Sequence, residues 1–177
     1  MSKRTLFLIG LGLELVAIFG LFVPYEIRLR SGEEAILRTI PVDPRSMFRG
    51  DYVVLNYAVG QDLPTPADFT GYGDPVYLVL AKKGDTYERV RFSDTKPELA
   101  EGQLCLLGRK EYNRAEFPDL AQYFVEEGLG HELENLQRAH RLLVHAIINP
   151  KTCSAIIKEL ELGPEVPGVN VMQDSFF

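Results

Sequence analysis

The most informative stretch of this chain is PVDPRSMFRGDYVVLNY, residues 41–57, in which a charged turn leads directly into an apolar strand. The glycine before the strand allows a positive backbone dihedral. Asp51 can accept hydrogen bonds from turn amides or pair with Arg45 or Arg49. Such a corner is typical either of a rigid structural turn or of a functional site, and both interpretations stay open. The residues singled out in it are Asp43, Arg45, Arg49, Gly50, Asp51, Tyr52, Leu55 and Tyr57.

The apolar half of this stretch predicts a strand over residues 52–59. Side chains alternate across a strand, so Leu55 and Tyr57 share one face and Tyr52 lies on the other. Both faces are apolar, which favours a position in the interior of a sheet. We expect the Tyr57 ring to be buried and its hydroxyl to bond the same polar turn.

The first 25 residues predict a membrane anchor. Residues 5–25 read TLFLIGLGLELVAIFGLFVPY, about as long as a helix needs to cross the hydrocarbon core. This stretch is longer than the core of a signal peptide, and no small-residue cleavage pattern follows it, so we expect an uncleaved helix that ends at Pro24 and Tyr25. The short basic tail before the helix favours a cytoplasmic N-terminus and an extracytoplasmic C-terminal domain.

Glu14 is the unusual residue of this anchor, because it lies at the middle of the span, where a charged side chain is costly. Either the carboxyl group has no role, or it makes a polar contact with another membrane helix. Small residues around it would let a partner helix approach closely, although they form no strict small-xxx-small repeat. These residues are Gly10, Gly12, Ala17 and Gly20.

Beyond residue 25 the hydrophobic pattern changes to a period of two, which predicts a β-rich domain over residues 26–162. A short amphipathic helix fits residues 129–139, and residues 163–177 form a poorly ordered tail. About eight strands and one short helix predict a mainly β fold, an antiparallel barrel or sandwich. The expected strands are 27–30, 36–42, 52–59, 76–81, 87–92, 103–112, 141–148 and 153–162.

Composition excludes several classes of function. A formal net charge of -6 argues against a nucleic-acid-binding protein, which needs a basic face. No cysteine–histidine pattern has zinc spacing, so no metal or cofactor is predicted, and His145 is expected to be a satisfied core or edge residue. Cys105 and Cys153 lie in apolar runs, which favours two buried thiols. A disulfide between them is the alternative and requires an oxidising compartment and neighbouring strands.

Residues 50–57, GDYVVLNY, match letter for letter the signature of the GDYXXLXY family of bacterial membrane-anchored proteins, which this chain resembles. The likeness extends to residues 41–45 and 48–49 before the motif and to residues 123–125, 127–128 and 132–134 after it. It covers most of the chain and implies a location in the bacterial inner membrane. Genes of this family often lie beside one for a multi-pass membrane protein, so the resemblance implies such a partner. It implies no particular activity.

Two functions remain open. The first, which we favour, is a non-catalytic, membrane-anchored interaction or assembly domain that works with a multi-pass membrane partner. The second is a membrane-anchored serine hydrolase similar to type I signal peptidase, with Ser46 as nucleophile and Lys82 or Lys83 as its base. The Pro-Thr that follows the serine-methionine in that family is missing, and the gap to Gly-Asp is shorter. Both lysines fall at an expected hairpin tip, whereas a base lysine has to be buried.

Overall fold

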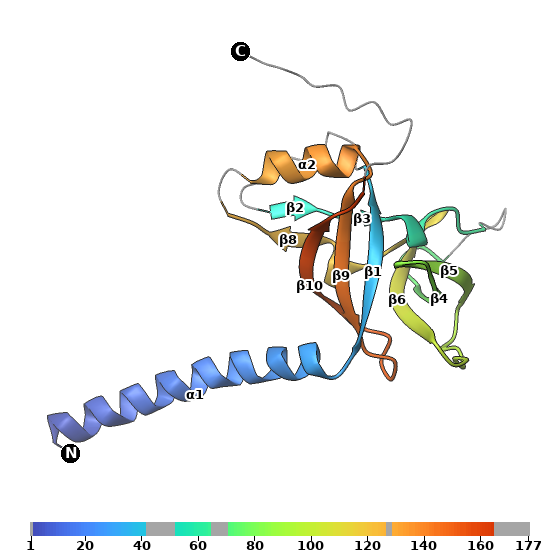
Figure 1. The fold of residues 1–177 in the computed structure, drawn as a ribbon. Helices are drawn as coiled ribbons and strands as arrows, with labels where there is room; N and C mark the ends of the chain where they lie inside the picture. The colour runs from blue at the N-terminus through green and yellow to red at the C-terminus, as the bar shows by residue number, and fades with distance from the viewer. Residues whose placement is uncertain (1, 42–51, 65–70, 127–128, 165–177) are drawn as a thin grey trace, which may run out of the picture.

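The computed structural model describes residues 2–41, 52–64, 71–126 and 129–164. This part of the chain contains ten strands and two α-helices, and the strands pair antiparallel throughout (Figure 1). The prediction of a mainly β fold is therefore confirmed. The elements are α1 (Lys3–Arg30), β1 (Glu33–Ile40), β2 (Tyr52–Val54), β3 (Asn56–Tyr57), η2 (Ala58–Gly60), β4 (Pro75–Lys83), β5 (Thr86–Ser93), β6 (Gln103–Glu111), β7 (Arg114–Glu116), η3 (Pro118–Leu120), β8 (Gln122–Phe124), α2 (Gly130–Arg138), β9 (Leu142–Ile148) and β10 (Ala155–Leu162).

Helix α1 is longer than predicted. It continues through Pro24 to Arg30, so the expected helix end at Pro24 and the expected strand over residues 27–30 are wrong. A proline inside a helix removes one backbone hydrogen bond and bends the helix without necessarily ending it. The following turn is stabilised by an ion pair of 2.7 Å between Arg30 and Glu26, one turn apart. The alternation of apolar and charged residues over 27–30, which predicted a strand, therefore belongs to the last turn of α1.

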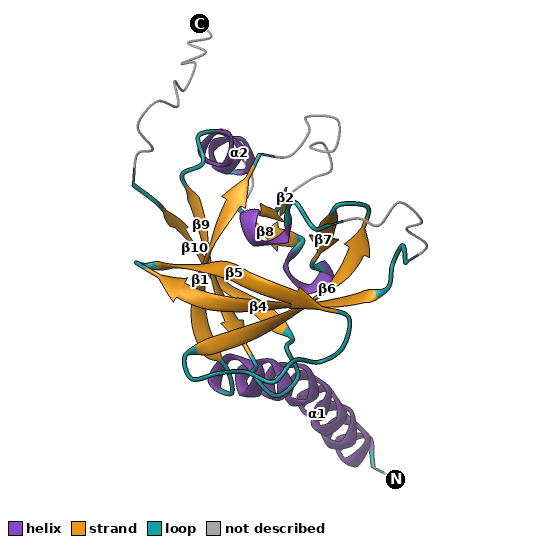
Figure 2. Cartoon of the chain, turned by 90° about the vertical axis from the view of Figure 1, so that its right-hand side faces the viewer, coloured by secondary structure: helices purple, strands orange, loops and turns teal. Residues whose placement is uncertain are grey.

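The strands form two four-stranded sheets and one two-stranded ribbon. The sheet orders are β10-β9-β1-β3 and β5-β4-β6-β7, and the ribbon is β2-β8. Strand β1 lies against β5, so the sheets curl into a half-barrel around one core (Figures 1 and 2). This geometry lies between the barrel and the sandwich that the sequence left open. Fully buried core side chains come from both sheets, among them Leu37, Leu78, Leu80, Leu106, Val144 and Ile148.

The local elements of the second half of the chain agree with the sequence. The β4–β5 hairpin turns at Gly84, whose φ of 64° falls in the left-handed region that glycine adopts without strain. The β9–β10 hairpin and helix α2 also form where they are expected. Helix α2 lies at the end of the domain opposite α1 (Figure 1), and the Gln137 amide donates to the Ile40 carbonyl over 2.9 Å. That bond fixes α2 to the end of β1.

A disulfide joins Cys105 to Cys153, so the prediction of two free thiols is wrong. Cys105 lies on β6 and Cys153 in the turn between β9 and β10, which means that the bond links the two four-stranded sheets. The Leu107 amide donates to the Cys153 carbonyl over 2.7 Å, and this contact brings the two Cα atoms to 4.9 Å, within the range that a disulfide spans. The two cysteines are 48 positions apart, so only the fold shows that they meet.

Candidate functional site

The motif strand, residues 52–57, connects one part of the fold to another. Among the described strands, its β2 half pairs only with β8, and its β3 half lies at the edge of the sheet that contains β1. The predicted position in the interior of a sheet is therefore wrong. The predicted alternation is confirmed, because Leu55 and Tyr57 are buried while Tyr52 is only half-buried. Between the two halves, the Leu55 amide donates to the Ala121 carbonyl over 2.8 Å.

Tyr57 is buried and connects the motif strand to the short helix η3. Its ring is buried and packs edge-on against Phe117, with 5.9 Å between ring centroids. Its hydroxyl donates to the Leu120 carbonyl over 2.8 Å and so holds the short helix η3, whereas the charged turn expected as its partner lies outside the described residues. Burial raises the pKa of the Tyr57 hydroxyl far above its usual value, which keeps it a neutral donor.

Phe117 lies in a slot between two glycines. A Cβ atom on Gly60 would lie 2.6 Å from the Ala115 carbonyl oxygen and 2.9 Å from the Phe117 ring. A Cβ atom on Gly108 would lie 2.8 Å from the Glu116 carbonyl oxygen and 2.9 Å from the same ring. Both positions therefore need glycine, because the backbone approaches too closely for any side chain. The slot locks the ring that supports Tyr57.

A cavity of about 370 Å³ lies beside the motif strand. Its lining is mixed, with apolar surface from Val54 and Pro118 and polar groups from Asn56, Glu116 and Gln122. Among the described residues that line it there is no serine, cysteine, histidine or lysine. The cavity offers hydrogen-bonding groups and apolar surface to a bound segment.

Two carboxyl groups meet near this cavity. A hydrogen bond with Glu111 raises the pKa of Glu116 above its usual value. Burial raises the pKa of Glu111, but hydrogen bonds with Glu116 and Arg114 outweigh burial and bring it below its usual value. The Arg114 guanidinium binds both carboxylates, with its Nε 2.5 Å from Glu111. We interpret the group as an ion-pair network at the surface, because Arg114 forms an ion pair with each of the two carboxyl groups.

An exposed aromatic pair lies at the ribbon end of the motif strand. Phe124 is 77% exposed and packs edge-on against Tyr52, with 6.0 Å between ring centroids. The pair therefore marks the part of the motif that faces outward, opposite the buried Leu55 and Tyr57.

The residues of the charged turn lie outside the described part of the chain. They are Asp43, Arg45, Ser46, Arg49, Gly50 and Asp51. Lys82 and Lys83, the alternative catalytic bases, are described and exposed at the end of β4. Lys83 forms an ion pair of 2.7 Å with Glu88 across the hairpin. Neither amine has the burial that lets a lysine act as a base near neutral pH.

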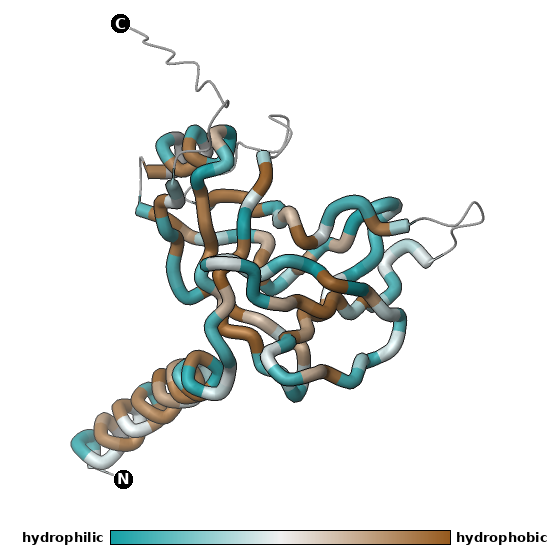
Figure 3. Tube along the Cα trace, turned by 45° about the vertical axis from the view of Figure 1, so that its right-hand side comes forward, coloured by the Kyte–Doolittle hydropathy of each residue, from teal (hydrophilic) through white to brown (hydrophobic). Residues whose placement is uncertain are grey.

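Helix α1 is exposed, in contrast to the buried half of the motif strand. It is long and apolar enough to span a membrane (Figure 3), and its apolar window of 18 residues has a mean hydropathy of 2.5 and is not buried within the chain. At a rise of about 1.5 Å per residue, its 28 residues measure about 42 Å, which exceeds the hydrocarbon core of about 30 Å. Glu14 is exposed near the middle of this helix, and no side chain in the described ranges bonds its carboxyl group.

A family model described as GDYXXLXY protein matches residues 14–159. The chain belongs to the GDYXXLXY protein family. The match starts within α1 and runs to β10, so the helix and the β domain are parts of one family architecture. No curated protein and no solved structure matches the chain.

Two polar interactions of the β domain are not evident from the sequence. Arg89 on β5 donates to the carbonyls of Val59 at 2.9 Å and Gln61 at 2.5 Å, and so fixes the turn that follows the motif. His145 on β9 lies between carboxylates of two other strands. Both depend on residues more than about ten positions away, and no local spacing signals such contacts. The alternating apolar pattern around His145 indicates only which face of the strand it occupies.

Proposed function

We propose that this GDYXXLXY family member is a non-catalytic assembly domain, anchored by α1 in the bacterial inner membrane, that works with a multi-pass membrane protein. The observation that carries the proposal is Glu14, a carboxyl group near the middle of an apolar helix with no partner among the described residues. Inside a bilayer such a group requires a polar partner, because lipid offers none. A second membrane helix supplies one at the right depth.

The face of α1 around Glu14 is suited to such a helix. At about 100° per residue, Gly10, Glu14 and Ala17 fall within a stripe about 60° wide, whereas Gly12 points to the opposite side. Side chains added at Gly10 or Gly12 would meet nothing within 4 Å in the described chain. Nothing described in the chain itself requires glycine at either position. A close approach by a partner helix would require it at Gly10 alone.

The disulfide supports an extracytoplasmic position for the β domain. Disulfides persist in oxidising compartments and are rare in the cytosol. Cys105 and Cys153 are fully buried and join the two sheets, so the bond is part of the architecture. The basic residues at the start of α1, Lys3 and Arg4, favour a cytoplasmic N-terminus. Both arguments favour the same orientation.

The experiment is affinity purification of the full-length tagged protein from bacterial membranes in a mild detergent, followed by mass spectrometry. We expect a multi-pass membrane protein to co-purify with the wild type. Glu14→Leu is expected to reduce recovery of that protein about five- to thirtyfold, because an interhelical polar contact and its packing contribute about 1–2 kcal/mol. Gly10→Leu should reduce recovery as well, since the larger side chain separates the helices.

Gly12→Leu is the matched control, with the same substitution on the opposite side of the helix. It should leave recovery of the partner unchanged. The proposal is wrong if Glu14→Leu and Gly10→Leu recover as much of the multi-pass protein as the wild type. It is also wrong if Gly12→Leu reduces recovery as strongly as Gly10→Leu, since the loss would then follow helix volume and not one face.

A further inference from the structure

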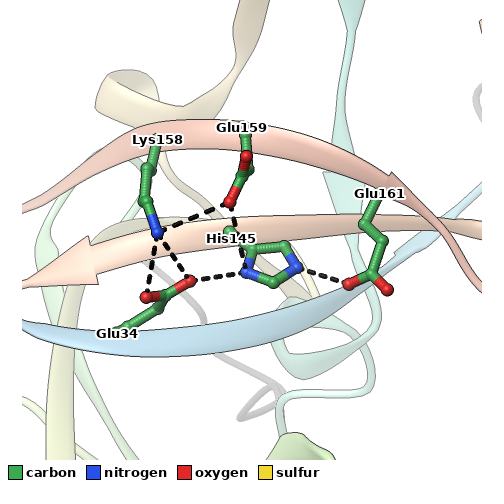
Figure 4. Close-up of polar contacts among 5 residues, drawn as sticks. All are labelled: Glu34, His145, Lys158, Glu159 and Glu161. Carbon is green, nitrogen blue, oxygen red and sulfur yellow. Dashed lines mark hydrogen bonds and ion pairs between the residues drawn. The ribbon is translucent and has the colours of Figure 1, made fainter.

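The outer face of the sheet β10-β9-β1 carries a cluster of charged side chains, here named the strand clasp (Figure 4). Its central residue is His145, whose side chain is only 14% exposed. Its other members come from the two neighbouring strands, one from β1 and three from β10. The strand clasp consists of Glu34, His145, Lys158, Glu159 and Glu161.

An irregularity in β10 builds this cluster. The pairing of β10 with β9 shifts between Ile157 and Glu159, which leaves Lys158 as one extra residue in the strand. A β-bulge of this kind redirects side chains. Lys158 and Glu159 therefore both reach the outer face beside His145 (Figure 4). Without the extra residue, strict alternation would place one of the two on the core side.

The two ring nitrogens of His145 face two different carboxylates. Nδ1 lies 2.6 Å from a Glu34 oxygen, and Nε2 lies 2.5 Å from a Glu161 oxygen. A neutral imidazole has one N–H and one lone pair, so it can donate to only one of these oxygens. The imidazolium form has two N–H groups and donates to both. The geometry therefore fits the protonated ring, which ties β9 to β1 on one side and to β10 on the other.

The pKa shifts in the cluster also favour the protonated form of His145. Burial alone lowers the pKa of His145, but hydrogen bonds with Glu161 and Glu34 outweigh it, so the pKa lies above its usual value. Hydrogen bonds with His145 and Lys158 lower the pKa of Glu34. The next charged residue on the outer face of β1 is Arg38, which is exposed. The flanking outward residues of β9, Leu143 and Ile147, are apolar.

Lys158 gives the cluster a second cation. Its ammonium lies 3.1 Å from Glu34 and 3.4 Å from Glu159. Possible ligand atoms of Glu34, His145 and Glu159 lie within 4.8 Å of one another, a spacing that a metal ion would also accept. The lysine already supplies positive charge to these carboxylates, so the cluster is complete as an ion-pair network. For Glu161, by contrast, His145 is the only donor among the described residues.

We propose that the strand clasp is a pH-sensitive link between the sheet and the strand that continues from the anchor helix. Glu34 is the second residue of β1 and follows the end of α1 by four positions. With His145 protonated, the clasp joins all three strands. When His145 loses its proton, the remaining N–H stays with Glu161, because Lys158 still holds Glu34. The link that opens is then the one between His145 and β1.

The pH dependence of stability follows from the pKa shifts of His145 and Glu34. His145 has a raised pKa in the folded protein, so its contribution to stability is present below the unfolded value of about 6.5 and is lost as the pH rises through the folded value. Glu34 has a lowered pKa, so its contribution is present above its unfolded value and is lost in acid. The clasp is therefore strongest in mildly acidic solution. This inference does not depend on the proposed membrane partner.

The test uses the full-length protein in detergent micelles, labelled with ¹⁵N in its histidine rings. Ring ¹⁵N chemical shifts report both protonation and tautomer. We expect the His145 pKa to lie above the ordinary histidine value of about 6.5 and its neutral form to carry the proton on Nε2. Glu34→Gln and Glu161→Gln should lower the pKa, whereas Lys158→Met should raise it because a like charge is removed. A merely structural role for His145 would not produce these opposite directions.

Urea unfolding at about pH 6 and about pH 8 gives a second measurement. The unfolding midpoint of the wild type should fall between the two pH values, and His145→Gln should abolish the fall. His140→Asn is the matched control: His140 is exposed with a φ of 56°, which asparagine tolerates, and this variant should keep the fall. The proposal is overturned if His145 titrates below the ordinary value, or if the midpoint of the wild type is the same at both pH values. An equal effect of His140→Asn would also overturn it.

Discussion

The motif strand and the anchor helix meet their physical requirements in opposite ways. The buried half of the motif finds every partner within the chain: Leu55 bonds Ala121, Tyr57 bonds Leu120, and the Tyr57 ring packs on Phe117. The apolar window of helix α1 is exposed along its whole length, and no described side chain bonds Glu14. The fold thus accounts for the buried half of the motif, Leu55 and Tyr57. The described chain supplies no cover for the apolar window of α1, so this helix requires lipid or another molecule around it.

This difference changes where function should be sought. A buried tyrosine that holds one short helix to a strand is a structural requirement of the domain, so its presence in the motif does not indicate a reaction. The candidate contact surfaces are the features that the domain leaves exposed. They are the Gly10–Glu14–Ala17 face of α1 and the Tyr52–Phe124 pair at the ribbon. Three measurements of stability test this division between the buried half of the motif and the exposed features.

The largest expected effect is loss of the disulfide. The bond closes a loop of 48 residues between the two sheets, for which chain entropy gives a contribution of about 4 kcal/mol. Replacing Cys105 and Cys153 together with alanine should lower the free energy of unfolding by about this amount. Urea unfolding followed by near-UV circular dichroism of the tyrosines measures it. The wild type with a reducing agent should show the same loss. If neither treatment changes the midpoint, the sheets are not joined in the folded protein.

A smaller effect is expected for Tyr57→Phe. The substitution keeps the ring on Phe117 but leaves the Leu120 carbonyl without its donor, which should cost about 1–2 kcal/mol. Tyr52→Phe is the matched change at the outward end of the same strand and should alter stability by less than about 0.5 kcal/mol. Equal losses for the two variants, measured by urea unfolding, would contradict the division of the motif into a buried half and an outward half.

The sequence predicted what depends on local pattern. Alternation placed Leu55 and Tyr57 on the buried face, and turn composition located the β4–β5 hairpin. It could not predict that the motif strand lies at an edge, because the partner β8 is about 70 positions away. Pairing of Cys105 with Cys153 and of His145 with Glu34 depends on the same kind of distant contact. The extension of α1 past Pro24 was missed because a short charged alternation fits a strand and a helical turn equally well.

The smallest expected effect on the β domain is that of Glu14→Leu. Because no described group of the β domain bonds this carboxyl, the substitution should move the free energy of unfolding of the domain by less than about 0.5 kcal/mol. The measurement is urea unfolding of the full-length protein in micelles, followed by the tyrosine signal, because seven of the eight tyrosines lie in the β domain and only Tyr25 lies on α1. A shift as large as that of Tyr57→Phe would mean that Glu14 supports the domain directly. An unchanged midpoint combined with loss of the membrane partner would assign Glu14 to association alone, which is the separation that the exposed helix and the buried motif imply.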